Sequence, residues 1–184
     1  MKKVLFLCAL MAFAAAPAGA STVINFDDLT GQASLPAGYA GLEWSSGWWY
    51  YDWAQAPFNP ASGATRLYNS FSDTPGIDFS ALGSVTFEGA YFAGRESVYM
   101  EGYLGGTLVG TSSTLDLDGT PTFLAANFGG NVDMVRLHVA RGSFVMDDVT
   151  YSAVSNPTIP APAALVLGSL GAGLVGWLRR RSTL

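Results

Sequence analysis

The chain has 184 residues, of which 49% are hydrophobic and only 12% are charged, and its formal net charge is −5. Disorder is excluded, because a disordered chain combines low hydrophobicity with high charge. The single cysteine, Cys8, excludes a disulfide scaffold. The acidic balance argues against nucleic-acid binding, since the phosphates would repel such a surface.

The first twenty residues have the pattern of a secretory signal peptide. Lys2 and Lys3 form a positive start, residues 4–16 form an apolar run, and Ala18-Gly19-Ala20 supplies the small residues before a cleavage site. We therefore expect residues 1–20 to form a signal helix that signal peptidase removes after Ala20. The mature chain would begin at Ser21.

The next segment, residues 21–155, has the pattern of an extracellular β domain. It holds all fourteen acidic residues and four arginines, with neither lysine nor cysteine. Apolar and polar residues alternate with a period of two, and turn signals such as Asp118-Gly119 separate the runs. The expected strands cover residues 22–26, 84–93, 97–103, 107–110, 121–125, 132–140 and 143–151. Many short strands without a helical pattern predict an all-β fold, a single jelly-roll-like antiparallel β-sandwich.

The C-terminal part divides into three short segments. Residues 156–162 form a proline-rich spacer that ends in Pro160-Ala161-Pro162. Residues 163–178 are apolar and uncharged, and as a helix they would span about 24–27 Å, the short end of a membrane crossing. Residues 179–184 begin with Arg179, Arg180 and Arg181, which the positive-inside rule places in the cytoplasm. The expected sandwich is thus flanked by a signal helix and a C-terminal transmembrane helix.

This C-terminal arrangement resembles the PEP-CTERM sorting signal of surface and exopolysaccharide-associated proteins in Gram-negative bacteria. The resemblance covers the last 28 or so residues: a Pro-x-Pro motif, a Gly-rich apolar run and a terminal arginine cluster. It departs from the family at Ala161, where the family has glutamate. The resemblance implies brief retention in the inner membrane, cleavage near the Pro-x-Pro motif by an exosortase-like membrane protease, and release to the cell surface. A permanent C-terminal anchor is the alternative, and both share one topology.

The body carries a second resemblance. The segments FEGAYFAG, VYMEGYLGGTLVGTS and FVMDDVTY follow one another in an order similar to that of galactose-binding-like jelly rolls. That group includes many carbohydrate-binding modules. The resemblance therefore implies a sandwich fold of a kind common among proteins with this sorting signal, and it implies little about chemistry.

Two pairs of acidic residues are candidate metal ligands. Asp27 and Asp28 follow the first expected strand, and Asp147 and Asp148 lie in the last. Galactose-binding-like modules often hold a structural Ca²⁺ between these strands, and the hard oxygens of carboxylates suit that ion. Simple alternation would place Asp147 on the face of Val145, Val149 and Tyr151, and Asp148 with Phe144 and Met146. The alternative is that these aspartates form turns and accept hydrogen bonds at strand ends.

A dense aromatic segment is the candidate ligand-binding region. If residues 48–53 are extended, Trp48, Tyr50 and Asp52 take one face and Trp49, Tyr51 and Trp53 take the other. One face of a strand in a two-layer sandwich is not in the core, so one aromatic set would lie near solvent, where rings can stack on sugars. The alternative is an aromatic core strand covered by a packed loop.

The sequence offers little for catalysis. His138 is the only histidine and lies on the polar side of an alternating run, where a surface histidine is expected. Zinc lacks ligands, and no phosphate-binding loop follows a strand. The leading hypothesis is thus a non-enzymatic surface protein of the extracellular polysaccharide matrix or biofilm. The alternatives are a carbohydrate-binding module with a defined glycan and, less favoured, a glycan-active enzyme, for which two carboxylates would have to face one cleft.

Overall fold

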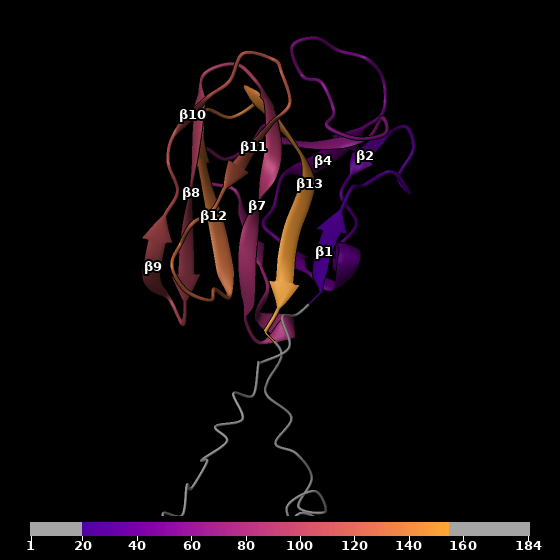
Figure 1. Cartoon of the computed structure of the whole chain (residues 1–184). Helices are drawn as coiled ribbons and strands as arrows, with labels where there is room; N and C mark the ends of the chain where they lie inside the picture. The colour runs from indigo at the N-terminus through magenta and orange to yellow at the C-terminus, as the bar shows by residue number, and fades with distance from the viewer. Residues whose placement is uncertain (1–19, 155–184) are drawn as a thin grey trace, which may run out of the picture. The chain divides into compact units, whose positions relative to one another are not determined.

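The computed structural model describes residues 20–154 of the chain, which fold into two antiparallel β-sheets (Figure 1). The seven-stranded sheet, here sheet A, has the order β11-β7-β13-β5-β4-β2, and β1 pairs with β13. The six-stranded sheet, sheet B, has the order β10-β8-β12-β6-β3, and β9 pairs with β8. The expected all-β fold with a two-sheet sandwich is confirmed.

The strands are short and the helical segments are single turns. Sheet A consists of β1 (Ser21–Ile24), β2 (Gln32–Ser34), β4 (Trp48–Tyr51), β5 (Arg66–Asn69), β7 (Val85–Gly94), β11 (Thr122–Ala125) and β13 (Phe144–Ala153). Sheet B consists of β3 (Glu43–Trp44), β6 (Gly76–Asp78), β8 (Ser97–Leu104), β9 (Thr107–Thr111), β10 (Leu115–Asp116) and β12 (Met134–Val139). Two 3₁₀ turns, η1 (Tyr39–Gly41) and η2 (Ser80–Leu82), complete the described part. Within residues 20–154 we find no helix with the length and apolar character needed to cross a membrane.

The core lies between the sheets and is built from the alternate residues of each strand. In β12 the inward residues Val135, Leu137 and Val139 are buried, while Arg136 is exposed and His138 is partly exposed, as alternation predicts. Leu137 pairs with Met100 of β8, which is also buried. From sheet A the core receives, among others, Phe87, Phe92, Phe144 and Met146. Because both sheets bury one apolar face, the sandwich closes without disulfides.

Every strand expected from the sequence is present, with bounds shifted by up to two residues, but several strands were not expected. These are β2, β3, β5, β6 and β10, each of two to four residues. Such segments are too short for alternation to distinguish them from loops. The predicted signal helix, spacer, transmembrane helix and arginine tail, and with them Ala18, Pro160 to Pro162 and Arg179 to Arg181, lie outside the described residues.

The predicted faces in β13 are right for Asp147 and Val145 but wrong for Asp148, Val149 and Tyr151, because the strand contains a bulge. The register against β7 shifts between Asp147 and Thr150, and Asp148 has a φ of 45°. Asp147 therefore shares the outer face with Val145 as expected, but Val149 and Tyr151 return to the core beside Phe144 and Met146. A bulge adds one residue to one strand and so reverses the alternation beyond it.

Candidate functional site: a cleft on the outer face of sheet A

The outer face of sheet A is covered by the long connection between β4 and β5, residues 52–65. A buried arginine at the start of β5 holds this β4–β5 loop. Arg66 is 1% exposed, and its guanidinium donates to the backbone oxygens of Phe58 at 2.8 Å, Ala64 at 2.8 Å and Trp53 at 2.6 Å. The same guanidinium lies 4.0 Å from the ring centroid of Tyr51. One fork-shaped cation thus fixes three points of the loop against the sheet.

A buried carboxylate holds the far end of the same loop. Asp147 is 2% exposed, and its Oδ2 accepts the backbone N–H of Ala61 at 2.8 Å and of Ser62 at 3.1 Å. Its Oδ1 accepts the N–H of Asp148 at 2.8 Å. Burial raises the pKa of Asp147 to about 6, and the neighbouring Asp148 also raises it, while the N–H donors act in the opposite direction.

Two further aspartates contact the loop. Asp148 Oδ1 accepts the hydroxyl of Ser62 at 2.7 Å, and Asp27 Oδ1 accepts the N–H of Ala64 at 3.1 Å. Gly63 packs so closely that a Cβ built on it would lie 1.9 Å from Asp27 Oδ1, and its φ is +46°. Residues 61–65 therefore need a glycine at this position to reach the carboxylates.

The four aspartates predicted as calcium ligands are only partly brought together. Asp27, Asp147 and Asp148 meet at residues 61–65. Asp28 instead accepts a hydrogen bond from the hydroxyl of Tyr39 at 2.5 Å. Burial is the largest cause of the raised pKa of Tyr39, and this hydrogen bond is the second. The donors that point at the three carboxylates are N–H and O–H groups, which is the arrangement of hydrogen-bond acceptors rather than of a cation cage. In residues 20–154 no cluster of three or more such side chains is positioned to hold a metal ion. A calcium site stays a prediction.

Between the loop and the strands lies a cleft of about 310 Å³, here the outer cleft. Tyr51 forms its floor, with the Trp53 ring centroid at 4.9 Å and that of Tyr68 at 5.5 Å. Gln32 Nε2 donates to the Tyr68 hydroxyl at 2.9 Å. The lining consists of Gln32, Tyr51, Trp53, Gln55, Phe58, Tyr68, Ser70, Gly142, Phe144 and Val145. The outer cleft is thus lined by aromatic rings, amides and hydroxyls, and within the described residues no charged side chain belongs to its lining.

The aromatic segment divides between core and cleft along the faces expected from the sequence. Trp48 is buried against Phe144, and Tyr50 packs on the same core. Tyr51 and Trp53 line the outer cleft, and Trp53 is 44% exposed. Trp49 shares the outward face with Tyr51 by alternation. The outward set is itself divided, because Tyr51 is only 4% exposed and packs with Phe58 of the β4–β5 loop. Each of the two interpretations therefore describes part of this face, and the role of the segment in binding stays a prediction.

Of the ten residues that line the outer cleft, only Tyr51 and Trp53 were predicted as site residues from the sequence. Gln32 belongs to β2 and Tyr68 to β5, two strands too short to be expected, while Gln55 and Phe58 lie in the β4–β5 loop. A usable signal was present in residues 66–69, where buried Leu67 separates Arg66 from Tyr68 on the opposite face. An arginine flanked by alternating large residues indicates a strand with one face under cover.

The outer face of sheet B carries the only histidine. The rings of His138 and Tyr99 stack in parallel with centroids 4.5 Å apart, and His138 Nε2 lies 2.7 Å from Glu101 Oε2. The Tyr103 hydroxyl donates to the same oxygen at 2.6 Å, and Arg136 lies 5.1 Å from the Tyr103 ring. These hydrogen bonds, first that of Tyr103 and then that of His138, lower the pKa of Glu101. The polar groups of this face therefore satisfy one another.

The predicted processing site of the signal peptide lies at the edge of the described residues. Ala20 is exposed, and Ser21 is the first residue of β1, where it pairs with Ser152. Comparison of the chain with protein-family models and with curated proteins finds no match.

Proposed function

We propose that this protein is a non-enzymatic, exported surface protein that binds a neutral polysaccharide in the outer cleft. The observation that carries the proposal is the exposed ring of Trp53 beside Tyr51 and Tyr68, in a cleft with amide and hydroxyl groups at its walls. A ligand in the outer cleft would contact sheet A beside the β4–β5 loop. The buried side chains of Arg66 and Asp147 hold that loop in place.

The chemistry of the lining favours a sugar over other ligands. The faces of hexose rings present C–H groups that pack on aromatic rings, while their hydroxyls exchange hydrogen bonds with amides such as Gln32 and Gln55. The lining itself offers an acidic sugar no cation, because Arg66 is buried and already donates to three carbonyls, and Arg95, 5.9 Å from the ring centroid of Phe58, is not a lining residue. We therefore assign the site to neutral glycans.

The sequence supports export and surface sorting of this domain. We infer cleavage after Ala20, brief anchoring in the inner membrane by residues 163–178, and processing at Pro160-Ala161-Pro162 by an exosortase-like protease. We also assign the sandwich to the jelly-roll type, because consecutive strands from β5 to β8 and from β11 to β13 alternate between the two sheets. Such a protein would contribute to the polysaccharide matrix or biofilm outside the cell.

Calorimetric titration of the full chain, in a detergent without sugar headgroups, tests the binding function. Neutral gluco-, manno-, galacto- and xylo-oligosaccharides are compared with acidic oligouronates. We expect saturable binding of one neutral class, and Trp53→Ala should weaken it about tenfold. Phe123→Ala removes another exposed ring of sheet A, on the edge strand β11, and should leave binding unchanged. Failure of all neutral glycans to bind, or binding by oligouronates alone, would overturn the proposal.

The sorting function needs a separate experiment. The chain is expressed in a Gram-negative host with and without an exosortase, and the product is identified by its mass and first residue. We expect the product to begin with Ser21 in both hosts. It should lack the arginine tail only in the host with the exosortase. Retention of the tail in both hosts would show a permanent anchor, and retention of residues 1–20 would contradict export.

A further inference from the structure

Among residues 20–154 the most exposed large apolar side chain is that of Phe71, at 68% exposure, in the segment that follows β5. An isolated exposed ring is normal on a mobile surface loop. Phe71 differs, because its backbone is held by hydrogen bonds on both sides. The backbone that presents the ring to solvent is therefore held in place.

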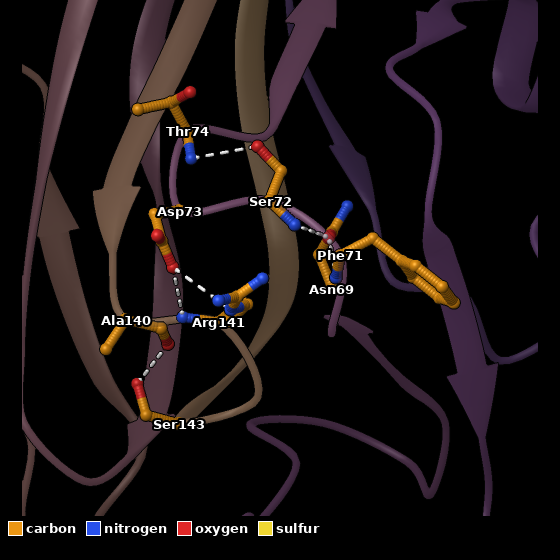
Figure 2. A network of polar contacts seen from close by, with 8 residues as sticks. All are labelled: Asn69, Phe71, Ser72, Asp73, Thr74, Ala140, Arg141 and Ser143. Atoms are coloured by element: carbon orange, nitrogen blue, oxygen red, sulfur yellow. Dashed lines mark hydrogen bonds and ion pairs between the residues drawn. The ribbon is translucent and has the colours of Figure 1, made fainter.

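A polar network holds this segment (Figure 2). Asn69 is buried, and its Oδ1 accepts the N–H of Phe71 and of Ser72, each at 3.0 Å, while its Nδ2 donates to Ser46 O at 3.1 Å. Asp73 Oδ1 accepts the N–H of Arg141 at 3.0 Å, which joins the segment to the turn before β13. Figure 2 shows the Phe71 ring pointing away from this network.

The same segment forms one end of the outer cleft. Ser70, which precedes Phe71, belongs to the cleft lining, as does Gly142. The N–H of Gly142 donates to Asn69 O at 2.9 Å, so both lining residues are tied to the buried asparagine. On its other side Phe71 packs on Gly47, where a built Cβ would lie only 2.8 Å from the Phe71 Cβ. The ring therefore lies beyond Ser70, next to the turn that leads into β4.

The register of β4 and β5 sets the spacing from the cleft floor to Gly47, on which Phe71 packs. Tyr51 pairs with Arg66, Trp49 with Tyr68 and Trp48 with Asn69, and Gly47 directly precedes β4, four residues before Tyr51. Four residues along a strand span about 13 Å. That length exceeds one sugar ring, so a single ligand that contacts both Trp53 and Phe71 must be a chain of several units.

We propose that Phe71 forms a distal subsite of the outer cleft, so that the site recognises an extended oligosaccharide rather than a terminal or single sugar. The inference rests on the proposed glycan-binding function. Trp53 and Tyr51 hold one part of the chain, and the fixed Phe71 ring packs on a later sugar unit beyond Ser70. Removal of the ring therefore weakens binding only of ligands long enough to reach it.

The test compares chain lengths with the full-length protein, by calorimetry in a detergent without sugar headgroups. Disaccharides and hexasaccharides of the neutral gluco-, manno-, galacto- and xylo- series are the probes. We expect Phe71→Ala to weaken hexasaccharide binding about five- to tenfold and to leave disaccharide binding unchanged. Phe71→Trp should restore the affinity. Trp53→Ala should weaken binding of both lengths, and Phe123→Ala should affect neither.

The outcomes separate the two proposals. Equal hexasaccharide affinity of wild type and Phe71→Ala would overturn the distal subsite and leave the glycan-binding function standing. Equal loss for both lengths would also overturn it, since it would place Phe71 in the proximal site. Absence of binding by the wild-type chain to every neutral probe would instead overturn the proposed function itself.

Discussion

The two outer faces of the sandwich have opposite designs. On sheet A, residues 52–65 cover the strands, and Arg66 and Asp147 are buried beneath them. On sheet B, β8 and β12 carry an open lattice of Tyr99, His138, Glu101 and their neighbours, whose polar groups bond to one another. The loop forms the outer cleft of about 310 Å³ with its uncharged lining, whereas a hollow of about 530 Å³ over β3, β6 and β12 of sheet B has Glu43, Asp78 and Arg136 in its lining.

The charged side chains of the two sheets have different roles. On sheet A the buried ions hold backbone groups and leave the cleft lining neutral, whereas on sheet B the charged groups lie at the surface and pair across strands. The first arrangement stabilises a shape, since buried charges require fixed partners. The second contributes little to stability, because solvent screens such pairs.

The largest expected effect comes from removing the cation that holds the loop. Arg66→Met keeps the buried stem but leaves the carbonyls of Trp53, Phe58 and Ala64 without their donor. We expect the free energy of unfolding to fall by about 3 kcal/mol in urea titrations. Hydrogen exchange should show opening of residues 52–65. Arg141→Met, at an exposed ion pair, is the matched control and should cost less than about 0.5 kcal/mol. Equal effects at both positions would break the contrast between buried and surface charge.

The next effect is a pH dependence of stability that belongs to sheet A. The pKa of Asp147 is about 6 in the folded chain, above its ordinary value of 3.8, so the folded state binds this proton more tightly than the unfolded state. Stability should therefore rise as the pH falls through about 6 toward 4, by on the order of 1 kcal/mol. Asp147→Asn should remove this rise in urea titrations at successive pH values. A variant that keeps the wild-type profile would assign the titration to another group.

Alternation in the sequence predicted the strands that bury one face along their whole length. It missed the strands whose burial depends on contacts with segments distant in the sequence. The alternation in residues 135–139 identified β12 correctly, because one face is buried along its whole length. Residues 66–69 were not predicted as a strand, although Leu67 between Arg66 and Tyr68 is a local signal for one, because Arg66 and Leu67 are both buried, on opposite faces, and the cover over Arg66 comes from a loop. The faces of Asp147 and Asp148 were unpredictable because the bulge depends on the partner strand.

The candidate site shows the same division. The aromatic faces of residues 48–53 followed from alternation, so Tyr51 and Trp53 could be grouped in advance. Gln32 and Tyr68 could not, because strand order within the sheet places them beside Tyr51 and no local pattern encodes that order. Ser70 could not either, because it follows β5, a strand that was not predicted. The network around Asn69 that fixes Phe71 likewise joins segments about seventy residues apart.

A smaller effect is expected on sheet B. His138→Ala removes the stacking on Tyr99 and one hydrogen bond to Glu101, which keeps its bond from Tyr103. Because the pair is partly exposed, the free energy of unfolding should fall by only about 0.5 kcal/mol. Glycan affinity should not change. A loss of affinity in the calorimetric titration would move the ligand site to sheet B and reverse the comparison of the two faces.

The smallest expected effect is that of removing calcium. The oxygens of Asp27, Asp147 and Asp148 that face residues 61–65 already accept hydrogen bonds from this segment. These hydrogen bonds form without a metal ion. We therefore expect the melting temperature and the glycan affinity to be equal in a chelator and in excess calcium. If calcium instead raises the melting temperature, and Asp27→Asn abolishes that rise while Asp28→Asn does not, the three carboxylates bind the ion after rearrangement of residues 61–65. The loop would then be held by a metal as well as by Arg66, and the cover of sheet A would depend on the concentration of calcium.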